Sequence, residues 1–192
     1  MFSFLKALGD RSIGKTTLLF RIRTGRLPGD YIPAVLDNYE LDHPSGIRLM
    51  MWDTGIADEY SPLRTVICAK EGIYMICYNC VQRASYERVF TRWLPMLLET
   101  RPTSPWILVG LKSDLKVAQK DAKDDDAPIS NEEAAERVKE HEPALVIQVS
   151  SLVGEKIDEL VNAAAEALQK AENSGKTKNA NRGSTMQSCS LM

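Results

Sequence analysis

The sequence predicts a single α/β domain whose mainly parallel sheet carries a phosphate-binding loop. First, Gly9–Thr16 matches the pattern G-x-x-x-x-G-K-[ST], and it lies between an apolar run at Phe2–Leu8 and a helix-like run at Thr17–Ile22. Second, the runs Gly72–Val81 and Trp106–Leu111 are almost continuously apolar, which is typical of strands in the middle of a parallel sheet. Third, 192 residues with 44% hydrophobic content suffice for one well-cored domain.

The residue types of the loop suit phosphate binding. Its backbone N–H groups and the start of the following helix face an anion, Lys15 supplies a positive charge, and the Thr16 hydroxyl can ligate Mg²⁺. The alternative is a glycine-containing turn with a chance lysine, but strand, loop and helix follow in the required order. The predicted phosphate-contacting residues are Gly9, Asp10, Arg11, Ser12, Ile13, Gly14, Lys15, Thr16 and Thr17. The chain therefore binds a nucleotide or descends from one that did.

Composition excludes several classes of protein. A net charge of −2 argues against a general nucleic-acid binder, which needs a basic surface. Lys6 interrupts the first apolar stretch, so no signal peptide is expected, and no apolar run approaches the roughly 18 residues of a membrane span. The four cysteines are too few and too irregularly spaced for a disulfide framework, and are expected to be reduced in the cytosol: Cys68, Cys77, Cys80 and Cys189.

The first half of the chain continues with a loop and a hairpin. Gly25 ends the first helix, and the prolines and glycine between residues 26 and 35 predict a surface loop. Leu36–Asp42 and Ile47–Trp52 are predicted strands, and the turn of residues 43–46 joins them into an antiparallel hairpin, which makes His43 a turn residue rather than a ligand. Asp53 follows the second strand, where its carboxylate can face the phosphate loop and hold Mg²⁺ through water.

The second half supplies a base-recognition motif. Apolar residues between Tyr86 and Leu97 follow helical spacing, and the strand Trp106–Leu111 leads into Lys112-Ser113-Asp114. The Asp114 carboxylate can accept hydrogen bonds from both N1–H and the exocyclic amine of guanine, a donor pair that adenine lacks. The Lys112 stem can lie over the base. The charged segment Lys116–Pro128 is expected to be a solvated insertion.

The remaining elements predict where the domain ends. Ser130 and Glu133 form a capping box that opens a helix through Val138, and the exposed His141 follows. A last strand at Leu145–Val149 and a final amphipathic helix complete a domain of residues 1–172. Residues 173–192 are predicted to be a disordered tail, and its ending, Cys189-Ser190-Leu191-Met192, is a C-a-a-X box that predicts farnesylation of the cysteine.

In order and spacing, these motifs resemble those of a Rho-family small GTPase over the whole chain. The stretch Tyr31–Tyr39 looks like the effector loop of Rho and Rac proteins. The resemblance implies a P-loop NTPase fold of the small G-protein type, with a six-stranded, mostly parallel sheet flanked by helices on both faces. It also implies GTP or GDP with Mg²⁺ above the strand ends, Thr16 and Asp53 at the metal, and further nucleotide contacts from Leu27, Tyr31, Lys112, Asp114, Leu115, Ser150, Ser151 and Leu152.

Several positions depart from the family pattern. Arg11 replaces a glycine beside the γ-phosphate, and Ala34 replaces a threonine that ligates Mg²⁺. Ile56 replaces a glycine that contacts the γ-phosphate, and Ala57 replaces the glutamine that orients the attacking water. Leu27 replaces an aromatic residue that flanks guanine. The sequence therefore predicts retained nucleotide binding, fast nucleotide exchange and impaired hydrolysis, with no catalytic residue intact.

The resemblance also suggests partners and a location. Effectors are expected to contact Tyr31–Tyr39 and the loop Asp53–Leu63, and exchange factors and a lipid-shielding dissociation inhibitor are possible partners of the family kind. Prenylated Cys189 would attach a monomer reversibly to the cytoplasmic side of a membrane, the plasma membrane being expected, with a cytosolic pool. Two alternatives remain open: a pseudo-GTPase scaffold whose nucleotide is structural or absent, and a P-loop kinase or ATPase. A kinase or ATPase would need a substrate lid and would not need the Lys-x-Asp motif.

Overall fold

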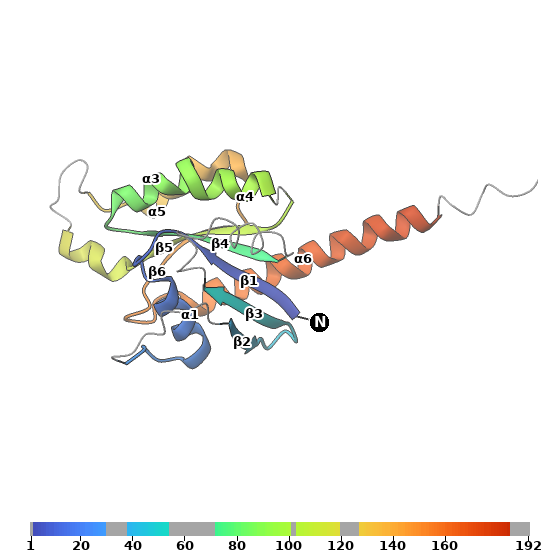
Figure 1. The fold of residues 1–192 in the computed structure, drawn as a ribbon, viewed down its shortest axis with the longest axis horizontal. Helices are drawn as coiled ribbons and strands as arrows, with labels where there is room; N and C mark the ends of the chain where they lie inside the picture. The colour runs from blue at the N-terminus through green and yellow to red at the C-terminus, as the bar shows by residue number, and fades with distance from the viewer. Residues whose placement is uncertain (1, 30–37, 54–71, 101–102, 120–126, 185–192) are drawn as a thin grey trace, which may run out of the picture.

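Six strands form one sheet in the order β2-β3-β1-β4-β5-β6 (Figure 1). The structure is a computed structural model that describes residues 2–29, 38–53, 72–100, 103–119 and 127–184. All neighbouring strands are parallel except β2 and β3, which pair antiparallel. The predicted six-stranded, mostly parallel sheet is therefore confirmed. The strands are β1 Phe2–Leu8, β2 Asn38–Asp42, β3 Arg48–Asp53, β4 Ile73–Asn79, β5 Trp106–Leu111 and β6 Leu145–Val149.

Helices cover both faces of this sheet, because β4 and β5 are buried along their whole length and need an apolar layer on each side. Figure 1 shows α1 and α6 on one face and α3, α4 and α5 on the other. The α-helices are α1 Lys15–Thr24, α3 Arg83–Arg88, α4 Leu94–Thr100, α5 Asn131–Val138 and α6 Ile157–Ser184. Shorter turns are a π-helix at Val89–Trp93 and 3₁₀ helices at Ser113–Gln119 and Lys139–His141.

The predicted hairpin is present. The N–H of His43 donates to the carbonyl of Ile47 at 2.9 Å, and Gly46 closes the turn with a left-handed φ of 83°. The first strand of the hairpin begins at Asn38 in the described part of the chain, and the predicted strand residues Leu36 and Asp37 lie outside it.

The helical spacing between Tyr86 and Leu97 does not give one regular helix. A π-helix separates α3 from α4, although Tyr86, Val89, Trp93 and Leu97 are all buried as the spacing predicted. The predicted core packing of this face is therefore confirmed. Periodicity indicates which side chains are buried, but not which carbonyl each N–H bonds.

Two further predictions differ in detail. Ser130 caps α5 by accepting from the Glu133 N–H at 3.0 Å, but the Glu133 carboxylate accepts from Arg83 at 2.6 Å instead of completing the capping box. Helix α6 continues past Asn173 to Ser184, in a segment for which composition predicted no secondary structure. Extension of an existing helix needs no new nucleus.

Among the described helices, none combines the length and apolarity needed to cross a bilayer.

Candidate functional site

The phosphate loop leaves the carboxyl end of β1 and enters α1. Its backbone requires glycine at Gly9, because a Cβ there would lie 2.5 Å from the Cys77 carbonyl oxygen and φ is +143°. Gly14, with φ of +114°, is the N-cap of α1, and Ser12 also has a left-handed φ of 59°. The loop is therefore a tight concave turn at a helix N-terminus, which is the geometry that binds phosphate.

Lys15 lies inside this loop. It is 3% exposed, and its Nζ donates to the carbonyl oxygen of Gly9 at 2.8 Å and to that of Asp10. Both contacts hold the ammonium group within the curve of the backbone. A positive charge thus faces the same space as the loop N–H groups.

The Asp10 side chain does not face that space. Its Oδ1 accepts from Trp93 Nε1 at 3.0 Å, and its Oδ2 accepts from Arg88 Nε. Its carboxylate is thus engaged with α3 and the π-helix, and only its main chain remains for phosphate. Sequence reasoning missed Arg88 and Trp93 as site residues, because they are 78 and 83 positions from Asp10. One feature of the sequence could have indicated such a partner: Asp10 is an acidic residue in an anion-binding loop, and its negative charge needs a nearby positive charge.

Thr16 and Asp53, the predicted metal ligands, are brought together by the sheet. Asp53 ends β3 beside Ala7 of β1 in parallel register, and its buried Oδ2 accepts from Thr16 Oγ1. Hydroxyl and carboxylate oxygens are the hard donors that Mg²⁺ prefers, and Mg²⁺ commonly takes one or two protein ligands, with water and phosphate completing its shell. The pair fits such an ion. Over the described residues there is no group of three or more His, Cys, Asp or Glu side chains that could hold a metal by itself.

The predicted base-recognition residues also meet. Lys112 has a φ of 61° and its Nζ donates to the Ser12 carbonyl at 3.4 Å, so its stem crosses towards the phosphate loop. Asp114 Oδ1 accepts from the hydroxyl of Ser150, which is buried. This hydrogen bond orients the carboxylate, and its remaining lone pairs can still accept from a base.

Apolar side chains accompany these polar groups. The exposed large hydrophobic residues of the described chain are Leu27, Leu115, Val117, Leu152 and Val153. Three of them, Leu27, Leu115 and Leu152, were predicted to contact nucleotide. Ser151, predicted to contribute a backbone contact, is half-buried and directly precedes Leu152 in the chain. Leu115 directly follows Asp114 in the chain, so an exposed apolar residue stands next to the oriented carboxylate in sequence.

Tyr39, the last residue of the predicted effector segment, is buried. Its side chain is 4% exposed, and the Arg23 guanidinium lies 5.4 Å from its ring centroid. Tyr39 is therefore a core residue of β2. Arg11 is exposed on the loop. Other predicted residues lie outside the described part: Tyr31, Ala34, Ile56, Ala57 and Cys189.

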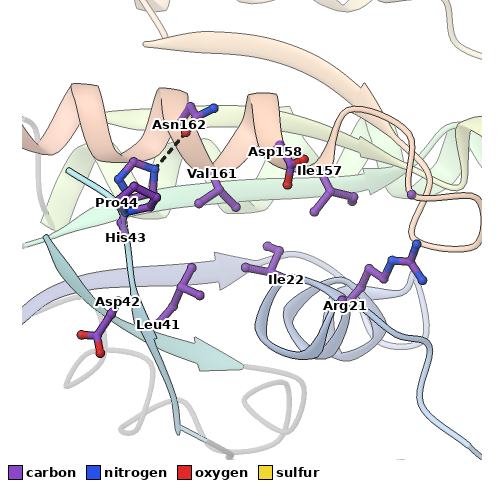
Figure 2. A pocket seen from close by; sticks show the side chains of 12 residues that line it. Arg21, Ile22, Leu41, Asp42, His43, Pro44, Ile157, Asp158, Val161 and Asn162 are labelled. Carbon is purple, nitrogen blue, oxygen red and sulfur yellow. Dashed lines mark hydrogen bonds between the residues drawn. The ribbon is translucent and has the colours of Figure 1, made fainter. Parts of the chain in front are cut away.

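A cavity of about 590 Å³ lies away from these residues, between α1, the hairpin and α6 (Figure 2). Ile22, Leu41 and Val161 contribute apolar side chains to its lining. His43 bridges the hairpin to α6, with Nε2 2.9 Å from Asn162 Oδ1. Its Nδ1 accepts from the Ser45 N–H at 3.2 Å, and His43 is a turn residue as predicted.

Comparison with known proteins gives consistent matches. A model of the Ras family matches residues 5–170. The "Rho-related protein racC" of Entamoeba histolytica is 38% identical over 115 residues, which are 58% of this chain and 59% of that protein. The "GTP-binding protein RHO4" of Saccharomyces cerevisiae is 36% identical over 165 residues, 84% of this chain and 55% of that protein. The matched regions thus span just over half the length of each relative.

Proposed function

Because the chain belongs to the Ras family of small GTPases, we propose that it is a Rho-type signalling protein that binds guanine nucleotides. The predicted membership of the Rho-type small GTPases is confirmed by these matches. The observation that carries the proposal is Asp114, whose carboxylate is oriented by Ser150 beside Lys112. This arrangement favours guanine over adenine, since only guanine offers two adjacent donors to one carboxylate.

The test of this function is the identity of the nucleotide that co-purifies with the protein, determined by chromatography of the released ligand. We expect GDP or GTP; ATP or ADP would instead support the kinase or ATPase alternative. Asp114→Asn should shift the preference towards xanthine nucleotides, because an amide can donate to the xanthine O2. A variant that keeps its guanine preference would contradict the assigned role of Asp114.

Mg²⁺ is part of this proposal. Thr16 and Asp53 would hold the ion, which would supply positive charge to offset that of the nucleotide phosphates. With Ala34 in place of a ligating threonine, Mg²⁺ should slow nucleotide release less than is usual in the family. A strongly Mg²⁺-dependent release rate, measured with and without EDTA, would contradict that expectation.

We further propose that hydrolysis of GTP is severely impaired. Orientation of the attacking water needs a side chain that Ala57 lacks, and Arg11, Ala34 and Ile56 alter other positions around the γ-phosphate. Loss of one preorganised donor typically costs about 10²–10³ in rate. A counter-hypothesis is that Arg11 acts as an arginine finger within the same chain. Single-turnover hydrolysis of γ-labelled GTP separates the two, since a rate typical of Rho proteins that falls in Arg11→Gly would favour the finger.

A further inference from the structure

The phosphate loop contains a negative charge at its second residue. The Asp10 side chain is only 7% exposed, so water screens its carboxylate weakly. An uncompensated carboxylate in this loop would repel the phosphates that the loop is proposed to bind. The chain must therefore offset this charge from another element.

Arg88 provides the offset. Its Nε donates to Asp10 Oδ2, while Trp93 Nε1 donates to Oδ1 at 3.0 Å, so both oxygens of the carboxylate are engaged. A hydrogen bond between charged partners is about twice as strong as one between neutral groups. The Arg88 side chain is 45% exposed, so only its donor edge is committed to the loop.

The π-helix makes this double contact possible. Arg88 is the last residue of α3 and Trp93 the last of the π-helix, where the Leu94 N–H bonds back to the Val89 carbonyl. In a regular α-helix, two side chains five positions apart in sequence point in directions that differ by about 140° around the axis, so they would not meet at one carboxylate. The wider π-turn lets both side chains reach one carboxylate, and such turns are frequent at functional sites.

We propose that Arg88 is a positioning residue for phosphate binding. It neutralises the Asp10 carboxylate and fixes the main chain whose Asp10 carbonyl accepts from the Lys15 ammonium. Arg88 thus acts on the ligand through Asp10 and Lys15 and need not touch it. This inference rests on the proposed function, since it assumes that the loop binds guanine nucleotide.

The test measures the affinity of the full chain for GMP, GDP and GTP, each with Mg²⁺, by competition with a fluorescent GDP analogue. In Arg88→Gln, we expect the affinity for GTP to fall about tenfold or more, that for GDP to fall less, and that for GMP to change little, because repulsion grows with each phosphate. Arg88→Lys keeps the charge and should recover part of the loss. Asp10→Asn combined with Arg88→Gln should restore GTP affinity, because a neutral amide needs no counter-charge.

The matched control is Arg137→Gln. Arg137 has a similar exposed fraction, 38%, and pairs with Glu87, a surface contact that does not involve the loop. The Arg137→Gln variant should therefore bind GMP, GDP and GTP with unchanged affinity. An equal loss for the three nucleotides in Arg88→Gln, or no rescue by Asp10→Asn, would mean that Arg88 is merely structural and would overturn the inference. If the unsubstituted chain bound none of the three, the proposed function would fail and the inference with it.

Discussion

At the residue scale, Leu27 is 37% exposed, and we propose that it flanks guanine in place of the aromatic side chain usual in the family. Stacking of a base on an aromatic ring contributes about 1–3 kcal/mol, of which leucine recovers only part. Leu27→Phe should therefore slow GDP release about tenfold, measured as displacement of a fluorescent GDP analogue by excess unlabelled nucleotide. Val117→Phe, at an exposed apolar residue with no predicted nucleotide contact, is the control. Equal release rates in the two variants would refute the role of Leu27.

Cys77 and Cys80 behave as core residues at the same scale. Burial raises the pKa of both thiols from 9.0 to about 12, because a thiolate would lose its hydration. Native Cys77 and Cys80 should therefore resist alkylation at pH 8, read by peptide mass spectrometry, and react readily in guanidinium chloride. Because the folded pKa lies above the unfolded one, their contribution to stability is complete below pH 9 and is lost as the pH rises from 9 towards 12. Rapid labelling of either cysteine in the native protein would contradict their burial.

At the scale of elements, two crossed ion pairs join α3 to α5. Arg83 of α3 donates to Glu133 of α5 at 2.6 Å, and Arg137 of α5 donates to both oxygens of Glu87 of α3 at 2.6 and 2.7 Å. The Arg137 guanidinium also lies 3.9 Å from the Phe90 ring centroid. These pairs are part-exposed, so solvent screening limits each to about 0.5–1 kcal/mol.

The Glu87–Arg137 pair makes stability depend on pH. The hydrogen bond from Arg137 lowers the pKa of Glu87 below its ordinary 4.5, so the pair stabilises the fold above that pH and is lost as the pH falls through the lowered value. Glu87→Gln should lower the free energy of unfolding by about 0.5–1 kcal/mol at pH 7 and by progressively less as the pH falls below 4.5, in urea titrations. Glu140→Gln, at an exposed position of the following 3₁₀ turn, should show no such pH-dependent difference. A Glu87→Gln effect that persists at low pH would show that packing, not charge, is responsible.

The elements themselves were largely predictable from sequence, and their long-range contacts were not. The strands β1, β5 and β6 begin and end at the predicted residues, because strands packed inside the sheet are mainly apolar along their length. The burial of Lys6 was not foreseen: it is 0% exposed, and its Nζ donates to the Tyr74 hydroxyl at 3.0 Å across the β1–β4 pair. The contact of Asp10 with Arg88 was not predicted either. In both cases the partner lies far along the chain, and no local sequence pattern indicates it.

At the scale of the molecule, the sheet topology explains why the site residues converge. The parallel strands β1, β3, β5 and β6 end at one edge, and each is followed by a predicted site segment. This part of the site was predictable from motif order, because a parallel sheet places every carboxyl end on one side. The hydrogen bond that joins Asp114 to Ser150 was not predictable from the sequence, because the orientation of these side chains depends on packing between the segments.

Convergence of four segments on one ligand also predicts that nucleotide stabilises the whole domain. A ligand that binds only the folded state, at 100 times its dissociation constant, adds about 2.7 kcal/mol, which for a domain of this size corresponds to about 5–10 °C in Tm. We expect GDP or a GTP analogue with Mg²⁺ to produce a shift of this order in thermal unfolding. ATP with Mg²⁺ should produce none if Asp114 has the proposed role of selecting guanine over adenine. Lys15→Ala should abolish the shift by removing the charge inside the loop. A scaffold that no longer binds nucleotide would melt at one temperature under all these conditions, so the same measurement distinguishes a nucleotide-binding protein from a pseudo-GTPase whose nucleotide is absent.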